Sequence, residues 1–244
     1  MIKPMIKRLS LYTLLLCLVP FFVWIFAWQW NGDIILTAFD QNLYWLTETG
    51  SMPYAVITST ILGFALMWLS GDKKYYKLIF FTALFAILGT QAIKSGLKAV
   101  FAEPRPYVME IMTQHNLFDE QFYAVPRAER EKIVSEFYRN KSVTPHWLKT
   151  HRENETGYSF PSGHSIFAAT WLMLFVGFAY LFKGQRRQVM PVAVVFMACW
   201  AVLMLISRLR LGMHYPVDLL VSTLIAWLLN IGIFCWISKK FDFI

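Results

Sequence analysis

The chain has 244 residues, of which 57% are hydrophobic and only 16% are charged, and its net charge is +8. A soluble domain usually carries about 25% charged residues, so this composition argues against a soluble protein. The length fits one membrane-embedded domain over residues 1–244. A basic chain could bind nucleic acid, but no nucleic-acid-binding module is present and the basic residues lie between apolar runs. We therefore expect no nucleic-acid partner and attribute the charge to membrane topology and anionic lipid.

The first apolar run, Leu9–Trp30, follows a short basic segment, as the apolar part of a signal peptide does. It is rich in aromatic residues, and no small-x-small cleavage site follows it. We predict an uncleaved first membrane helix; a cleaved signal peptide is the alternative.

Five further apolar runs are long enough, some marginally, to cross the roughly 30 Å of bilayer hydrocarbon. In chain order they are Pro53–Ser70, Leu78–Ile93 (continuing to Lys98), His164–Phe182, Val189–Ile206 and Tyr215–Ser238. Helices satisfy their own backbone hydrogen bonds in lipid, and the runs are too long for the strands of a membrane barrel. The sequence therefore predicts an all-α polytopic membrane protein with six transmembrane helices.

Charged residues in the connectors indicate the orientation of these helices. Basic residues lie before the first run and after the second, fourth and sixth: Lys3, Lys7, Arg8, Lys73, Lys74, Lys77, Lys183, Arg186, Arg187, Lys239 and Lys240. The connector between the first and second runs contains Asp33, Asp40 and Glu48 but no Lys or Arg. By the positive-inside rule, both termini are cytoplasmic and the long connector at about 99–163 is extracytoplasmic.

That long connector is the largest segment outside the apolar runs. Its stretch PRAEREKIVSEFYRN, residues 126–140, has apolar residues at helical spacing and a proline at its start, which predicts a short helix. We expect the connector to form a small helical cap at the lipid surface, between the third and fourth membrane helices.

Three polar clusters interrupt the apolar pattern. They are KAVFAEPRP with Lys98 and Arg105, PSGH with Ser162, Gly163 and His164, and SRLRLGMHYPVD with Arg208, His214 and Asp218. The first cluster lies at the end of the third apolar run, and the second cluster lies at the start of the fourth apolar run. The third cluster connects the fifth apolar run to the sixth. In an alternating six-helix topology these four helix ends share one face, the extracytoplasmic one.

Each cluster also has a simpler interpretation. Lys98 and Arg105 could be snorkelling residues at a helix end, and Ser162 could simply cap a helix. A single His214–Asp218 pair is often structural, although an intramembrane carboxylate is a functional candidate. These simpler interpretations do not explain why all three clusters share one face. For Arg210, which lies in the third cluster but is assigned no role in the site, we retain the snorkelling interpretation.

The shared residues suit a phosphate-sized dianion. Arg105, Arg208 and Lys98 can form a cationic cradle, and the N–H groups at Ser162 and Gly163 can bind an anion at a helix N-terminus. We predict that His214, oriented by Asp218, attacks phosphorus. His164 would then protonate the leaving oxygen. Carboxylates are too few for a hydrolytic two-metal site, so we expect neither a metal nor a cofactor.

The motifs K-x6-RP, PSGH and SR-x5-H-x3-D resemble the three motifs of the type 2 phosphatidic acid phosphatase superfamily, in the same order and with no departure at the motif positions. The stretch ETGYSFPSGH and the residues of the third motif, SRLRLGMHYPVD, are most similar to the bacterial phosphatidylglycerophosphatase B subfamily. The resemblance implies the same roles for His214, His164 and Asp218, and phosphate binding by residues matching Lys98, Arg105, Ser162, Gly163 and Arg208.

The resemblance also implies a lipid phosphatase of the bacterial cytoplasmic membrane whose site faces the periplasm. Implied substrates are phosphatidylglycerophosphate, phosphatidic acid, diacylglycerol pyrophosphate and undecaprenyl pyrophosphate, with the bilayer itself as the remaining partner. Glu103, His115 and Glu155 are candidate head-group contacts, with solvated loop residues as the alternative. Two other functions remain open: a lipid-phosphate transporter that only binds its anion, and a vanadate-dependent haloperoxidase. The sequence does not indicate the oligomeric state.

Overall fold

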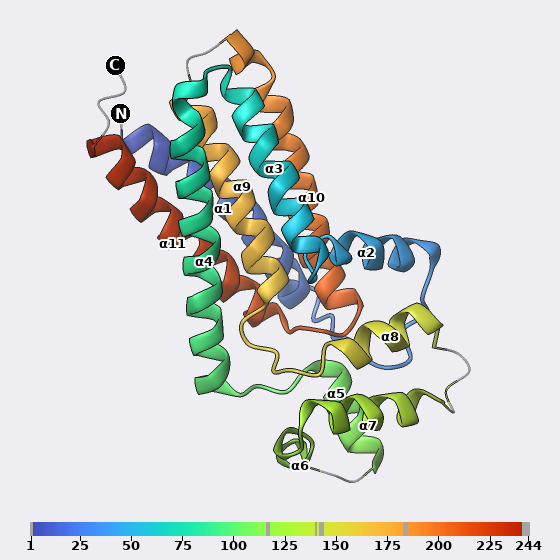
Figure 1. Ribbon diagram of the computed structural model, residues 1–244. Helices are drawn as coiled ribbons and strands as arrows, with labels where there is room; N and C mark the ends of the chain where they lie inside the picture. The colour runs from blue at the N-terminus through green and yellow to red at the C-terminus, as the bar shows by residue number, and fades with distance from the viewer. Residues whose placement is uncertain (1, 116–117, 140, 142–143, 183–184, 241–244) are drawn as a thin grey trace.

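A computed structural model describes residues 2–115, 118–139, 141, 144–182 and 185–240 (Figure 1). Within these residues the regular structure is helical. The helices are α1 (Ile2–Ile25), α2 (Ala38–Glu48), α3 (Tyr54–Ser70), η1 (Lys73–Tyr75), α4 (Tyr76–Phe101), α5 (Pro106–His115), α6 (Asp119–Ala124), α7 (Arg127–Arg139), α8 (His146–Asn154), α9 (Gly163–Leu181), η2 (Gln185–Gln188), α10 (Met190–Arg210) and α11 (Pro216–Lys240). The all-α prediction is confirmed for this part of the chain.

Each of the six apolar runs forms one helix: α1, α3, α4, α9, α10 and α11. In the described part of the chain, five helical segments are long and apolar enough to cross a membrane, whereas α3, with 17 residues, is shorter. The boundaries of α1 differ most from the prediction, because the helix begins at Ile2 and ends at Ile25. The basic residues Lys3, Lys7 and Arg8 therefore lie within its first turns, while Lys183 lies outside the described residues.

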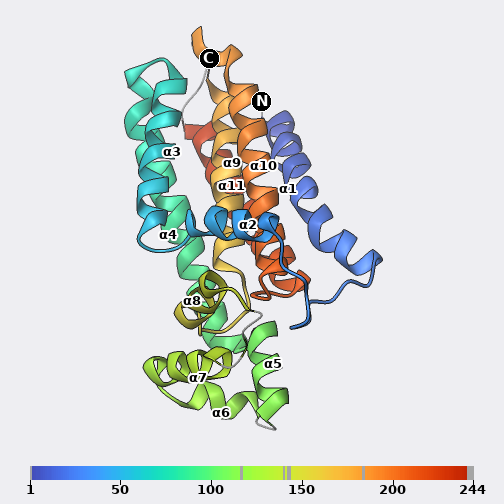
Figure 2. The same ribbon diagram turned by 90° about the vertical axis from the view of Figure 1, so that its right-hand side faces the viewer.

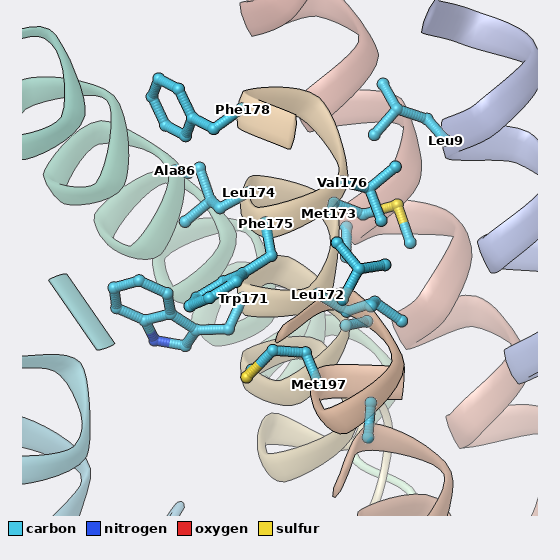
Figure 3. Packing of buried hydrophobic residues seen from close by; sticks show 14 of the residues in the cluster. Leu9, Ala86, Trp171, Leu172, Met173, Leu174, Phe175, Val176, Phe178 and Met197 are labelled. Carbon is cyan, nitrogen blue, oxygen red and sulfur yellow. The ribbon is translucent and has the colours of Figure 1, made fainter. Parts of the chain in front are cut away.

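Helix α9 is the centre of the bundle and packs against α1, α3, α4, α10 and α11. Of its most apolar stretch, 83% is buried, against 22–44% for the other long apolar segments. Its side chains point outward in all directions to these neighbours, among them Trp171, Met173 and Phe178 (Figure 3). At Gly177 the absence of a side chain admits the ring of Phe234 from α11. The helix that carries the PSGH cluster at its start is thus fixed by its neighbours along most of its length.

Helices α5–α8 form a separate layer at one end of the bundle (Figures 1 and 2). Its centre is the buried guanidinium group of Arg152, which lies 5.0–5.5 Å from the rings of Trp30, Tyr107 and Tyr138. The predicted helix at 126–140 is confirmed as α7, although residue 140 itself lies outside the described residues. Glu155 is the C-cap that directly follows the last residue of α8. The packing of α8 around Arg152 therefore sets the position of Glu155.

Helix α2, which the sequence analysis did not predict, lies across the bundle near the same end (Figure 2). Asp40 in its first turn is fully buried and pairs with Arg210 of α10 through two contacts of 2.7 and 2.8 Å. The interpretation of Arg210 as a snorkelling anchor is therefore wrong: its guanidinium group fastens α2 to α10.

The first turns of α1 and the last turns of α11 lie together at the other end of the bundle, far from α5–α8 (Figures 1 and 2). Helices η1 and η2 both contact α3. The described basic connectors therefore gather at one end, and the cap layer forms the opposite end.

Candidate active site

The three polar clusters converge at the end of the bundle next to the cap layer. Lys98 lies in the last turn of α4, His164 in the first turn of α9, and Arg208 in the last turn of α10. His214 lies between α10 and α11, where Gly212 adopts a positive φ of 70° and turns the chain back. The shared face predicted from helix parity is thus present.

His214 is held by a carboxylate and a hydroxyl group. Its Nδ1 lies 3.0 Å from Oδ2 of Asp218 and 3.2 Å from Oγ of Ser159, and the Ser159 hydroxyl also donates to Asp218. The backbone N–H of Tyr215 donates to the same carboxylate oxygen at 3.0 Å. Because an ionised carboxylate only accepts hydrogen bonds, Nδ1 carries the proton. Nε2 therefore presents its lone pair on the other side of the ring.

That lone pair faces the predicted cradle. Nε2 of His214 lies 3.4 Å from Nη1 of Arg105, whose guanidinium group is also fixed by the carbonyl oxygens of Gly157 (2.7 Å) and Met213 (3.3 Å). Burial, together with the positive charges of Arg105 and Arg208, holds the pKa of His214 well below its ordinary value. A neutral, correctly oriented imidazole next to a fixed cation is the arrangement that a nucleophile for phosphate requires.

Glu155 lies at the centre of the cradle. Its Oε2 is 3.1 Å from Nη1 of Arg105 and 2.9 Å from Nη2 of Arg208, and its Oε1 is 3.5 Å from Nε2 of His164. Burial raises the pKa of the Glu155 carboxyl, but the positive charges around it, first that of Arg208, hold this pKa well below the usual range. An anion thus already occupies the position between the two arginines.

Lys98 and the start of α9 complete the cradle. The Lys98 ammonium group donates to the carbonyl oxygen of Tyr158. The Ser162 hydroxyl is buried and accepts from the N–H of Ser165, so this side chain caps α9. The N–H groups of Gly163 and His164 are the first of the helix, where no intrahelical acceptor is available. They remain as donors for a bound anion.

His164 and His214 both line one cavity. Its Nε2 is 3.0 Å from Oγ of Ser51. A methyl group at Gly50 would lie 2.9 Å from Cδ2 of the His164 ring, so the connector between α2 and α3 packs directly on this histidine.

A second layer of side chains holds Arg208, which is fully buried. Nη1 of Arg208 lies 2.9 Å from Oγ1 of Thr47 and 3.1 Å from Nε2 of His151. His151 in turn contacts Glu48 at 3.2 Å. Four of these neighbouring residues are not indicated by the sequence motifs, because they come from α2, α8 and connectors that carry no motif: Thr47, Ser51, His151 and Ser159. Of these, only Ser159 lies next to a motif, PSGH, which could have indicated it.

The three candidate head-group contacts have different surroundings. Glu155 lies in the cradle, and the Glu103 carboxyl group lies beside that of Asp218. His115 lies in the cap layer, where its ring contacts that of Phe137 at a centroid distance of 5.6 Å. The structure therefore brings Glu155 and Glu103 to the site but not His115.

The cavity has a volume of about 1080 Å³ and extends from His214 and Arg105 along the space between α3 and α4. Helices α3 and α4 meet near η1 and diverge toward the site (Figure 1). The lining beyond the polar residues is largely apolar: Ala55, Val56, Phe64, Met67, Ile79, Phe80, Ala83, Leu84, Ile87 and Leu88. From Ala55 to Met67 the cavity follows α3 for about 18 Å, given the rise of 1.5 Å per helical residue.

Comparison with known proteins gives consistent matches. A family model described as the PAP2 superfamily matches residues 79–242, which include all the motif residues from Lys98 to Asp218. The chain is 52% identical over 240 residues to phosphatidylglycerophosphatase B of Haemophilus influenzae, covering 98% of this chain and 99% of that protein. It is 36% identical over 240 residues to phosphatidylglycerophosphatase B of Escherichia coli K12, covering 98% of this chain and 91% of the relative.

Proposed function

The chain belongs to the PAP2 superfamily, and on that premise we propose that it is an integral membrane lipid phosphatase that acts through a phosphohistidine intermediate. The observation that carries this proposal is that an oriented histidine, His214, lies next to a cradle formed by Arg105 and Arg208. The Glu155 carboxylate lies between these two arginines, where a substrate phosphate would bind. The proposed substrates carry a phosphate monoester or a pyrophosphate on a lipid tail. They include phosphatidylglycerophosphate, phosphatidic acid, diacylglycerol pyrophosphate and undecaprenyl pyrophosphate.

In the first step, the substrate phosphate displaces the Glu155 carboxylate and binds Arg105, Arg208, Lys98 and the N-terminus of α9. Nε2 of His214 attacks phosphorus, and the bond from phosphorus to the leaving oxygen breaks. His164 gives its proton to that oxygen. Asp218 stabilises the positive charge that develops on the His214 ring.

In the second step, water attacks the phosphohistidine. His164, now neutral, takes a proton from that water, and the phosphorus–nitrogen bond breaks to return His214 to its neutral state. Inorganic phosphate leaves, and His164 is again protonated for the next cycle. Fixed cations stabilise the transferring phosphoryl group throughout, so we expect turnover without a metal ion.

We further propose six membrane spans, with both termini cytoplasmic and the site at the periplasmic surface of a bacterial inner membrane. The 17 residues of α3 lie at the lower end of the length range for a membrane helix. The apolar cavity between α3 and α4 would take the lipid tail from the bilayer while the head group reaches the cradle.

The decisive experiment is phosphate release from a panel of lipid phosphates in detergent, with and without a chelator. We expect His214→Ala to lower turnover by roughly 10⁶-fold, the order of the loss that removal of a catalytic nucleophile causes. His146→Ala is the matched control, because His146 is an exposed histidine of α8 outside the cavity. With radiolabelled substrate, the unmodified protein should form an acid-labile phosphohistidine that His214→Ala does not form.

Near-native turnover in His214→Ala would disprove the assigned nucleophile. Binding of lipid phosphate without any phosphate release would instead support the transporter. Vanadate-dependent halide oxidation would support the haloperoxidase.

A further inference from the structure

Helix α4 carries a second lysine that the phosphatase mechanism does not use. Lys94 lies one helical turn before Lys98, and Gln91 lies almost one turn before Lys94; all three side chains line the cavity. Residues three and four apart share one face of a helix. The same face continues toward the middle of α4 with Ile87, Leu88 and Leu84. The cavity wall therefore changes along α4 from cationic, to polar, to apolar.

The Lys94 ammonium group lies next to the polar part of this wall, at Gln91. Nζ donates to Oε1 of Gln91 at 2.6 Å, so the side chain extends back toward the middle of α4 and away from the nearer helix end. A snorkelling lysine would extend the other way, toward the interface. Among the described residues, no carboxylate oxygen lies within 4.0 Å of Nζ. A positive charge within a membrane helix and without a directly paired carboxylate is costly and is a candidate for binding a ligand.

The stem of Lys94 is also fixed against the start of α9. A Cβ atom at Gly163 would lie 3.1 Å from Cδ of Lys94 and 3.6 Å from its Nζ. Lys94 therefore contacts the motif that we propose binds the transferred phosphate. With a rise of 1.5 Å per residue, the Cα atoms of Lys94 and Lys98 are offset by about 6 Å along α4. Their ammonium groups have different partners, Gln91 and the carbonyl oxygen of Tyr158, so the two lysines can contact two phosphates of one head group.

We propose that Lys94, together with the amide group of Gln91, binds the second, non-transferred phosphate of lipids that carry two phosphates. Oε1 of Gln91 accepts from Lys94, which leaves the amide N–H groups as donors to the same phosphate. The substrate's terminal phosphate then lies in the cradle, its inner phosphate at Lys94, and its tail along α3 and α4. This inference rests on the proposed function, and it makes lipids with two phosphates the preferred class.

The test compares two substrate classes on Lys94→Met, Lys94→Arg and Gln91→Leu. One class has a single phosphate, represented by phosphatidic acid. The other has two, represented by diacylglycerol pyrophosphate, with adjacent phosphates, and phosphatidylglycerophosphate, with glycerol between them. The matched control is Lys77→Met, which removes an exposed lysine from the opposite end of α4.

We expect Lys94→Met to raise KM about tenfold for at least one lipid with two phosphates, as the loss of a charge-assisted hydrogen bond does. The kcat/KM for phosphatidic acid should stay within about twofold, and Lys94→Arg should restore KM. Gln91→Leu should cause a smaller change in the same direction. A loss confined to one of the two lipids would show which phosphate spacing the subsite fits.

An equal loss on phosphatidic acid, or no loss on any substrate, would overturn the subsite. Failure of the proposed function is distinguishable, because the unmodified protein would then release no phosphate from either class.

Discussion

At the scale of single residues, the carboxylate of Glu155 is the main feature that the motifs alone do not explain. It contacts both cradle arginines and His164, so it holds together three groups that would otherwise repel one another. Arginine–carboxylate and arginine–phosphate contacts use the same planar geometry. Glu155 therefore competes with the substrate for the same two arginines.

We expect Glu155→Gln to strengthen inhibition by inorganic phosphate or vanadate about tenfold, because the competing charge is removed while the side-chain shape is kept. The inhibition constant is measured on the purified protein in detergent. Glu129→Gln is the control, since Glu129 is an exposed residue of α7 that is not among the residues lining the cavity. An unchanged or weaker inhibition constant in Glu155→Gln would contradict the competition.

The pH dependence of activity tests the environment of His214. The free enzyme must hold this ring neutral to attack, and its pKa lies well below the ordinary value of about 6.5 because of burial and of Arg105 and Arg208. The neutral form therefore persists into acid, and the acid limb of kcat/KM should lie below pH 6.5. A profile with phosphatidic acid, measured where chemistry limits the rate, checks this. An acid limb at or above pH 6.5 would contradict it.

At the scale of helices, the position of α9 depends on close contact with its neighbours. Phe234 of α11 is fully buried, lies 5.3 Å from Phe178 between ring centroids, and fills the space over Gly177. A Cβ atom at position 177 would come within 2.2–2.6 Å of the Phe234 ring. Because the site begins at the first residue of α9, displacement of this helix would also move the cradle.

We expect Gly177→Ala to destabilise the protein by about 1–3 kcal/mol, the usual cost of overpacking, and so to lower the melting temperature in detergent. Gly232→Ala in α11 is the control, because a Cβ atom there meets nothing within 4 Å. That control should keep or slightly raise the melting temperature, since alanine favours the helix. Equal melting temperatures for the two variants would argue against tight α9–α11 packing.

The helices differ in how well the sequence could predict them. The six apolar runs are long and nearly free of charge, so their helices were predictable to within a few residues, apart from the start and end of α1. Helix α2 has 11 residues and α8 has 9, and both mix charged and apolar side chains. Their helical state depends on tertiary contacts, such as the Asp40–Arg210 pair, that no local pattern shows.

At the scale of the whole molecule, the grouping of basic connectors at one end and the cap layer at the other fits one orientation in the membrane. This orientation is testable with single cysteines in a variant from which Cys17, Cys199 and Cys235 have been removed. We expect Glu131→Cys in α7 to react with a membrane-impermeant maleimide in intact cells after permeabilisation of the outer membrane only. Lys74→Cys in η1 should react only after lysis. The reverse pattern would invert the proposed topology.

The site itself was predictable in part. Helix parity predicts that Lys98, His164, Arg208 and His214 share one face. Lys98, His164 and His214 line one cavity, and Arg208 contacts Glu155 in the same lining. The interactions between them were not predictable, because they depend on how irregular segments return to the bundle. Ser159 approaches His214 from the connector before α9, and Glu155 reaches the cradle from the end of α8. Neither placement follows from spacing along the sequence.

The contact of Gly50 and Ser51 with His164 has a consequence for protein engineering. These residues precede the segment that matches the superfamily, residues 79–242, and so does Thr47, which contacts Arg208. Grafting the three motifs onto another helical scaffold would therefore transfer the nucleophile and the cationic groups but leave out the surface against which the second histidine rests. A working transplant would need the α2–α3 segment as well, with a residue as small as glycine at position 50.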